Sequence, residues 1–248
     1  MDCPVTAARV SSRTSLWAGR VALLMIALCA ALVAGCGGNA SDGGASNEQA
    51  PAPPPADGSV PARPKIVALG DSLTAGLGLL EQQAYPALLQ RKIDADGYQF
   101  DVVNAGVSGD TSAGGLRRLE WALEGDVRVL IVALGANDGL RGLQVADMKN
   151  NLAEIVERAK ERKIMVILAG MEAPPNYGPE YTASFRRAYQ DVAGEHGVLF
   201  IPFLLAGVAG QSNLNQGDGI HPTAEGAAII AETVWRVLRP ALDQMSTS

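Results

Sequence analysis

From Lys65 onward, short uncharged apolar runs alternate with amphipathic segments, and this alternation limits the possible folds more than any other feature of the chain. The runs have the length of buried strands, whereas the segments between them repeat apolar residues at helical spacing. Strands that alternate with helices predict one α/β domain whose parallel sheet is covered by helices on both faces. In such sheets, ligands bind beyond the carboxyl ends of the strands, so catalytic residues are expected in the loops that follow them.

The pattern gives specific expectations for the elements. The expected strands are 66–69, 100–103, 129–134, 164–168 and 198–201, and the expected helices are 85–94, 116–123, 145–161, 180–195 and 222–238. The run from Val129 to Leu134 is the most apolar of the five, which favours a place in the middle of the sheet.

The first 64 residues differ in character from the rest. Three arginines precede an apolar run from Val21 to Ala34, which is too short to span a bilayer and is typical of a signal peptide. The run ends in Leu-Val-Ala-Gly-Cys at 32–36, which resembles a bacterial lipobox, and an ordinary secretory signal with a nearby cysteine is the alternative. Residues 37–64 are rich in Gly, Ala, Ser and Pro, so they are interpreted as a disordered tether with a reach of roughly 30 Å.

A processed lipobox would remove residues 1–35 and leave Cys36 as the lipidated N-terminus. Several acyl chains on one cysteine anchor a protein stably, so we expect a membrane-anchored lipoprotein of the cell envelope. Gly rather than Asp follows the cysteine, and in a Gram-negative bacterium this resembles export to the outer membrane, facing the periplasm. The expected organisation is a signal peptide at 1–35, a lipidated cysteine and tether at 36–64, a folded domain at 65–240 and a tail at 241–248.

Composition excludes several functions. The formal net charge is −6 and no long basic stripe is present, which argues against a nucleic-acid binder. Cys36 is the only cysteine that would survive removal of the leader, so a disulfide core within one chain and a cysteine-based zinc site are excluded. The chain has only two histidines, too few for the ligand clusters of a metal-dependent hydrolase. We therefore expect neither a metal nor an organic cofactor.

Any histidine base must be His196 or His221. His196 lies at the end of an expected helix, where a cationic or donor side chain is favourable, and it is interpreted as a cap. His221 follows Asp218 by three residues, just before the last expected helix. An aspartate in that position can bind the imidazole Nδ1–H and leave Nε2 free to take a proton. A helix-capping turn is an equally good interpretation of this pair on its own.

A candidate nucleophile follows the first expected strand, in Gly-Asp-Ser-Leu at 70–73. Ser72 at the end of a strand is suited to this role, although Gly, Asp and Ser are also favoured in ordinary polar turns. The motif is not the Gly-x-Ser-x-Gly elbow of the α/β-hydrolases. The chain also lacks a phosphate-binding loop and a complete dinucleotide fingerprint at this point.

Two further loops hold groups that a serine–histidine pair would need. Gly109 follows the second expected strand, and its N–H can approach a developing oxyanion because glycine has no Cβ. Asn137 follows the third strand and offers a side-chain amide donor. Each residue also suits a simple connection between a strand and a helix. Their joint appearance with Ser72 and the Asp-x-x-His pair is difficult to attribute to chance.

At these four blocks the chain resembles the SGNH, or GDSL, esterase and lipase superfamily, and the resemblance spans residues 65–240. The resemblance is greatest to the bacterial branch of multifunctional thioesterase I, or lysophospholipase L1, and its arylesterase relatives. The matching stretches are 104–112, 135–142 and 176–178. The resemblance implies a flavodoxin-like three-layer α/β/α sandwich with a five-stranded parallel sheet. It also implies a Ser72–His221–Asp218 triad and an oxyanion hole formed by Ser72 N–H, Gly109 N–H and Asn137.

The resemblance implies a serine ester hydrolase of the arylesterase, lysophospholipase or acyl thioesterase type, which works through an acyl-enzyme without a cofactor. Its expected partners are a small ester or lysolipid substrate and, through Cys36, a membrane. Five residues of the expected rim loops suggest an apolar acyl or aryl site, or equally pack the loops: Leu140, Met171, Tyr177, Tyr181 and Leu214.

One stretch departs from the family pattern. Relatives tend to have Arg-Leu-Pro before Asn-Tyr-Gly, whereas this chain has Met-Glu-Ala-Pro-Pro at 171–175. That loop borders the acyl groove in the family, so acyl-length preference and thioester activity are left open. A carbohydrate O-acetyl esterase of the same superfamily and a catalytically inert envelope lipoprotein are the alternative functions.

Overall fold

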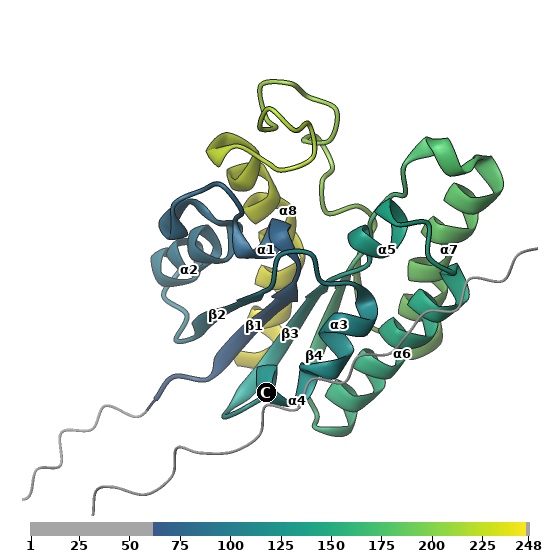
Figure 1. Ribbon diagram of the computed structural model, residues 1–248. Helices are drawn as coiled ribbons and strands as arrows, with labels where there is room; N and C mark the ends of the chain where they lie inside the picture. The colour runs from purple at the N-terminus through teal and green to yellow at the C-terminus, as the bar shows by residue number, and fades with distance from the viewer. Residues whose placement is uncertain (1–61, 247–248) are drawn as a thin grey trace, which may run out of the picture. The chain divides into compact units, whose positions relative to one another are not determined.

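A parallel five-stranded sheet forms the centre of the computed structural model, which describes residues 62–246. The strand order is β2-β1-β3-β4-β5, and all four neighbouring pairs are parallel (Figure 1). The strands are β1 Lys65–Gly70, β2 Asp101–Gly106, β3 Val127–Ala133, β4 Met165–Ala169 and β5 Leu199–Ile201. The predicted α/β class and parallel sheet are confirmed, and the most apolar run is the middle strand, β3.

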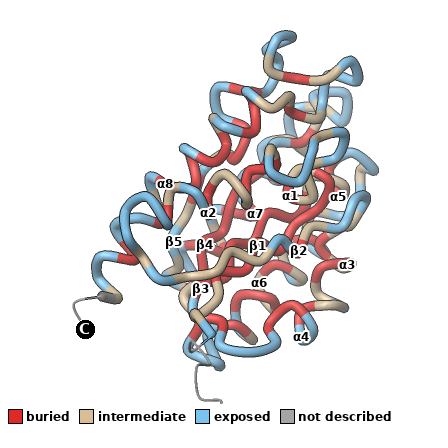
Figure 2. Tube along the Cα trace, turned by 90° about the vertical axis from the view of Figure 1, so that its left-hand side faces the viewer, coloured by how far each residue is buried: buried red, intermediate tan, exposed pale blue. Residues whose placement is uncertain are grey.

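Helices cover both faces of the sheet, which gives three layers. On one face α2 (Tyr85–Ala95) packs beside α8 (Ala224–Ser246), and on the other α6 (Val145–Glu161) packs between α3 (Ser112–Arg117) and α7 (Pro179–His196) (Figure 1). Because both faces are covered, the three inner strands β1, β3 and β4 are buried along most of their length, whereas the edge strands β2 and β5 are partly exposed (Figure 2). This is the three-layer sandwich that the family resemblance implied.

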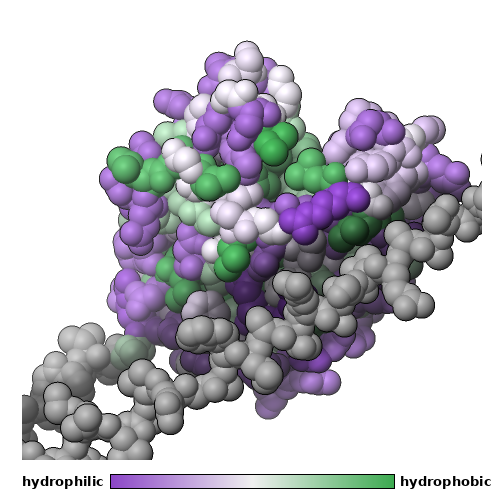
Figure 3. Space-filling view, in the orientation of Figure 1, coloured by the Kyte–Doolittle hydropathy of each residue, from purple (hydrophilic) through white to green (hydrophobic). Residues whose placement is uncertain are grey.

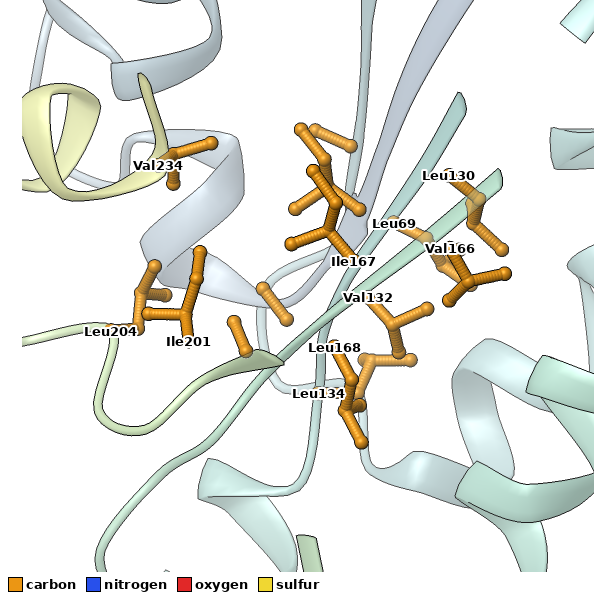
Figure 4. Close-up of a cluster of buried hydrophobic side chains, with 14 of the residues drawn as sticks. Leu69, Leu130, Val132, Leu134, Val166, Ile167, Leu168, Ile201, Leu204 and Val234 are labelled. Carbon is orange, nitrogen blue, oxygen red and sulfur yellow. The ribbon is translucent and has the colours of Figure 1, made fainter. Parts of the chain in front are cut away.

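The core extends from the sheet into the covering helices. In Figure 4 the strand residues Leu130, Val132, Val166 and Leu168 cluster at the sheet, and all four are at most 3% exposed. Helix α6 contributes the apolar stripe that its sequence predicts, namely Met148, Leu152, Ile155, Val156 and Ala159, all fully or almost fully buried. Burial of this stripe holds α6 on the sheet, since the opposite side of the helix is polar.

Several short elements were not predicted. They are α1 Ser72–Ala75, η1 Glu81–Gln83, α5 Ala136–Leu140 and η2 Pro175–Tyr177. The single helix expected at 116–123 is two helices, α3 and α4 (Leu119–Ala122), which meet at Arg118. Helix α3 begins earlier than predicted because the Thr111 hydroxyl caps it by accepting the Gly114 N–H.

Both predicted limits of the folded domain need correction. The expected tail at 241–248 is wrong for 241–246, because α8 continues to Ser246 and buries Leu242 completely. Pro240 removes one backbone donor from this helix, but burial of the apolar side chains around it offsets that loss. At the other end, Arg63 belongs to the expected tether but forms ion pairs with Asp94 and Asp101.

The expected signal peptide, the lipobox and Cys36 lie outside the described residues. Within residues 62–246, no helix is both long and apolar enough to cross a membrane.

Candidate active site

The predicted nucleophile lies at the carboxyl end of β1. Strand β1 ends at Gly70, Asp71 caps the following helix, and Ser72 is the first residue of α1. A side chain at position 70 is impossible without rearrangement, because its Cβ would lie 2.0 Å from Thr74 Oγ1 and 2.9 Å from the Ala133 carbonyl oxygen. The tight turn that this glycine permits leaves Ser72 at the edge of the sheet, 9% exposed.

Ser72, His221 and Asp218 form a continuous chain of hydrogen bonds, although 149 positions separate the serine from the histidine. Ser72 Oγ lies 2.9 Å from His221 Nε2, and His221 Nδ1 lies 2.6 Å from Asp218 Oδ2. The other carboxylate oxygen of Asp218 accepts the backbone N–H groups of Ile220 and His221, each at 3.0 Å. The structure thus brings together the three side chains that the sequence singled out.

The hydrogen bonds to Asp218 keep its carboxylate ionised. The backbone N–H of His221 is the largest influence, followed by the His221 side chain and the N–H of Ile220, and together they lower the pKa of Asp218 to about 2. The side chain is 46% exposed, so water also solvates the charge. A carboxylate that stays charged at neutral pH can orient the imidazole and stabilise its protonated form.

Two backbone donors that follow strand ends make no hydrogen bond to any other described residue. They are the N–H of Ser72, which begins a helix and has no acceptor in a preceding turn, and the N–H of Gly109. Gly109 has a φ of +83°, a conformation that favours glycine. These free donors come from the loops after β1 and β2, as the sequence predicted.

Asn137 is held between two acceptors. Its Nδ2 atom donates to the Asp110 carbonyl oxygen at 2.9 Å and to Asp71 Oδ2 at 3.2 Å. An oxyanion beside Ser72 would therefore compete with Asp71 for the hydrogen that makes the longer bond. The side chain comes from α5, directly after β3, so the amide is fixed at the same edge as the other two donors.

Asp71 is a buried carboxylate whose importance the sequence did not indicate. It is 1% exposed, and burial raises its pKa to about 6, although hydrogen bonds from the Leu73 N–H and the Asn137 amide oppose the shift. In the sequence this residue resembles an ordinary helix cap, a role that it also has. Only the folded structure reveals that its second oxygen contacts Asn137.

A cavity of about 500 Å³ opens beside the triad. Its polar lining includes Ser72, His221 and Asn137, together with Asp71, Glu172 and Asn215, whereas most of the wall is apolar. The apolar wall comprises Leu73, Ala136, Leu140, Met171, Ala173, Pro174, Phe203, Leu205, Ala209 and Ile220. In Figure 3 apolar side chains gather on the upper part of the visible face, where the strands end. The volume and the lining are typical of a site for a small apolar ligand.

Two of the five predicted substrate contacts line this cavity, namely Leu140 and Met171. The other three do not. The Tyr177 and Tyr181 hydroxyls donate to the carbonyls of Leu140 and Leu143, so both rings brace the outside of that loop. Leu214 packs against the core instead. Sequence reasoning missed Phe203, Leu205 and Ala209, which reach the cavity from the segment after β5.

His196 lies where its sequence context predicted, as the last residue of α7 before the left-handed Gly197. Its Nε2 faces Glu157 Oε1 at 3.9 Å. Among residues 62–246, no three histidine, cysteine, aspartate or glutamate side chains gather in a way that could hold a metal ion.

The chain matches the model of the GDSL-like lipase/acylhydrolase family over residues 68–229. Esterase TesA of Pseudomonas aeruginosa is 43% identical over 178 residues, which are 71% of this chain and 89% of the relative. Thioesterase 1/protease 1/lysophospholipase L1 of Escherichia coli K12 is 36% identical over 182 residues, covering 73% and 86%.

Solved structures of esterases from the same family are also similar to this chain. A crystal structure of TesA superposes with a TM-score of 0.69 at 43% identity and covers 71% of this chain and 98% of the other. AlinE4, an SGNH-hydrolase family esterase, superposes with a TM-score of 0.61 at 40% identity and covers 73% and 97%. The protein therefore belongs to the GDSL-like lipase/acylhydrolase family, and it is a carboxylic ester hydrolase.

Proposed function

We propose that the protein hydrolyses carboxylic esters with Ser72 as nucleophile, His221 as general base and acid, and Asp218 as the group that orients the histidine. The observation that carries this proposal is the hydrogen-bond chain at 2.9 and 2.6 Å, which ends at the wall of an apolar cavity. A neutral imidazole in this position can take the serine proton without further movement.

The reaction proceeds through an acyl-enzyme. Ser72 Oγ attacks the ester carbonyl carbon while His221 Nε2 takes its proton, and His221 then gives that proton to the leaving alcohol as the ester bond breaks. Water enters, His221 takes a proton from it, and the resulting hydroxide attacks the acyl-enzyme. Ser72 leaves with the proton, and the carboxylic acid is released.

Three hydrogen-bond donors stabilise the negative charge of each tetrahedral intermediate: Ser72 N–H, Gly109 N–H and the Asn137 amide. Two of them have no competing acceptor in the described protein, so no internal hydrogen bond needs to break before they act. Loss of one such donor in a serine hydrolase typically costs ~2.7–4 kcal/mol of transition-state stabilisation.

We further propose that the acyl chain occupies the apolar cavity and that the leaving group lies toward solvent. Met171, Phe203 and Leu205 offer apolar contacts but few polar partners. Glu172 and Asn215 also reach the lining, but most of it is apolar, which favours aryl esters, lysophospholipids and acyl thioesters over sugar O-acetates. The names of the esterase, thioesterase and lysophospholipase relatives support the same substrate classes.

A substrate panel tests this proposal. The purified protein is assayed with p-nitrophenyl esters of increasing acyl length, a lysophospholipid, an acyl thioester and acetylated xylan, alongside Ser72→Ala. We expect kcat/KM to rise from acetyl to longer chains and Ser72→Ala to be inactive on every substrate. A preference for acetyl-xylan would favour the O-acetyl esterase, and no turnover of any ester would favour an inert lipoprotein.

We also propose that Cys36 is lipidated and anchors the enzyme in the cell envelope, in the outer membrane facing the periplasm if the source is Gram-negative. The support is the order of arginines, apolar run and lipobox in residues 1–36. Wild-type protein should then fractionate with membranes, while Cys36→Ser should lack the acylated terminal peptide and retain its esterase activity. An unmodified Cys36 in the mature wild-type protein, found by mass spectrometry, would refute the anchor without affecting the esterase proposal.

A further inference from the structure

Arg118, between α3 and α4, binds three separate segments of the catalytic edge. Its Nε donates to Asp110 Oδ2 at 2.6 Å, its Nη1 to the Ala105 carbonyl at 2.7 Å and its Nη2 to the Gly70 carbonyl at 2.8 Å. The Arg118 side chain is only 17% exposed and that of Asp110 only 18%, so this ion pair is largely removed from water. Removing one partner of such a pair leaves a charge that is poorly solvated.

The three residues that accept these hydrogen bonds lie close in sequence to Ser72 and Gly109. Gly70 ends β1, two residues before Ser72, and Ala105 is the last residue but one of β2, four residues before Gly109. Asp110 directly follows Gly109. One planar guanidinium therefore ties the end of the nucleophile strand to both sides of the Gly109 loop. A lysine could not do so, because its ammonium group lacks the fixed fork of donors.

The contact network continues from Asp110 to the third donor. The Asp110 carbonyl oxygen accepts the Asn137 amide at 2.9 Å, and the Asp110 N–H donates to the Val107 carbonyl at 3.1 Å, which closes the turn around Gly109. The Gly70 carbonyl oxygen accepts a second bond, from the Val107 N–H at 3.0 Å. The position of Asp110 thus influences Gly109 through the turn and Asn137 through a direct hydrogen bond.

We propose that Arg118 is a positioning residue for the oxyanion hole: through Gly70, Ala105 and Asp110 it sets the relative positions of Ser72 N–H, Gly109 N–H and the Asn137 amide. This proposal rests on the roles proposed above for those donors. Preorganised donors stabilise an oxyanion only if they are already aimed at it, so a small displacement of the Gly109 loop weakens two donors at once.

A purely stabilising role for the ion pair makes different predictions. It would lower the melting temperature of Arg118 variants without changing the kcat of the molecules that remain folded. A positioning role lowers kcat at temperatures where the variant is fully folded, and it affects KM little, since the donors act on the transition state more than on the bound ester.

The test compares Arg118→Lys and Arg118→Met with a matched control, Arg63→Met. Arg63 also forms an ion pair with an aspartate of β2, Asp101, but at the opposite end of that strand. Each variant is first checked for folding by circular dichroism, and kcat and KM are then measured with a p-nitrophenyl ester. For both Arg118 variants we expect kcat to fall at least tenfold, while KM changes less than about threefold. The kcat and KM of Arg63→Met should equal those of wild type.

A double-mutant cycle with Asn137→Ala supplies the readout that a structural role would not give. If Arg118 acts through the oxyanion hole, Arg118→Met should reduce kcat much less in the Asn137→Ala background than in wild type. Added guanidinium at a non-denaturing concentration should also partly restore the kcat of Arg118→Ala. If Arg118→Met does not fold, Arg118→Lys and the guanidinium rescue decide the question.

Two results would overturn the proposal: an unchanged kcat in folded Arg118 variants, or losses that multiply independently with the loss from Asn137→Ala. These outcomes are distinct from failure of the proposed mechanism. Full activity of Ser72→Ala would refute the mechanism, whereas an inactive Ser72→Ala together with a normal Arg118→Lys would refute only the positioning role.

Discussion

The two halves of the catalytic centre are constructed differently. The half that holds the nucleophile and the oxyanion donors lies at the carboxyl ends of β1, β2 and β3, where Asp71, Asp110 and Arg118 join the loops by hydrogen bonds. The half that holds Asp218 and His221 lies on a loop before α8, and its aspartate is 46% exposed. Stabilisation of the oxyanion thus depends on loops joined by hydrogen bonds at the strand ends, whereas proton transfer depends on a more exposed loop before α8.

The difference reflects what each half must do. Donors to an oxyanion have to be aimed before the charge develops, because reorientation during the reaction would reduce the benefit. The loop of His221 needs only to present one nitrogen to Ser72, and four hydrogen bonds made within or from residues 218–221 achieve this. We expect substitutions to reveal this asymmetry.

The largest effect should come from breaking the contact between the halves. Ser72→Ala and His221→Ala should each lower kcat by roughly 10⁴–10⁶-fold, and the double variant should be little worse than either, because the two side chains act as one unit. Steady-state kinetics on one p-nitrophenyl ester would measure all three variants. Independent, multiplying losses would contradict a shared proton-transfer step.

A smaller loss is expected for Asp218→Asn. The substitution removes the charge that stabilises the imidazolium and disturbs the tautomer, which costs about 10⁴-fold where the triad aspartate is buried. Here water reaches the carboxylate, so we expect a loss of roughly 10²–10³-fold in kcat. An unaltered melting temperature at neutral pH would separate this effect from unfolding, and a variant as active as wild type would remove Asp218 from the mechanism.

Local sequence predicted Ser72 and the two donor positions because each follows the end of a strand. A parallel sheet brings the carboxyl ends of all its strands to one edge, so Ser72, Gly109 and Asn137 could be expected to meet before any coordinates existed. His221 followed from the scarcity of histidines. Topology and residue chemistry thus selected these positions, and the family resemblance supplied their roles in a triad and an oxyanion hole.

The cavity wall and the supporting residues could not be predicted in this way. Phe203 and Leu205 reach the cavity from the segment after β5, and local sequence left open whether Tyr177 contacts substrate or packs the loop, because an aromatic residue in a rim loop can face either side. Arg118 was hidden inside a pattern interpreted as one helix. Its role depends on the break between α3 and α4, which turns the side chain toward two carbonyls at strand ends.

The smallest expected effect concerns Asp71, the buried counterpart of the exposed Asp218. Its pKa of about 6 in the folded protein lies above the ~3.9 of an unfolded chain, so the folded state resists ionisation of this carboxyl. Below pH 4 the group is protonated in both states and costs nothing. Between about pH 4 and pH 6 the unfolded chain ionises first, so the folded state loses up to about 3 kcal/mol of stability relative to it, and the loss is complete above pH 6.

Asp71→Asn should remove this pH-dependent cost, because the amide has the same shape and does not titrate. The melting temperature of the variant relative to wild type should therefore rise between pH 4 and pH 7 and level off above it. Altered hydrogen bonds to Leu73 and Asn137 would add a difference that is the same at every pH, so the slope is diagnostic and the absolute value is not. If the melting temperatures of the two proteins instead changed with pH in parallel across this range, ionisation of Asp71 would not destabilise the folded state. The contrast with Asp218 would then rest on exposure alone.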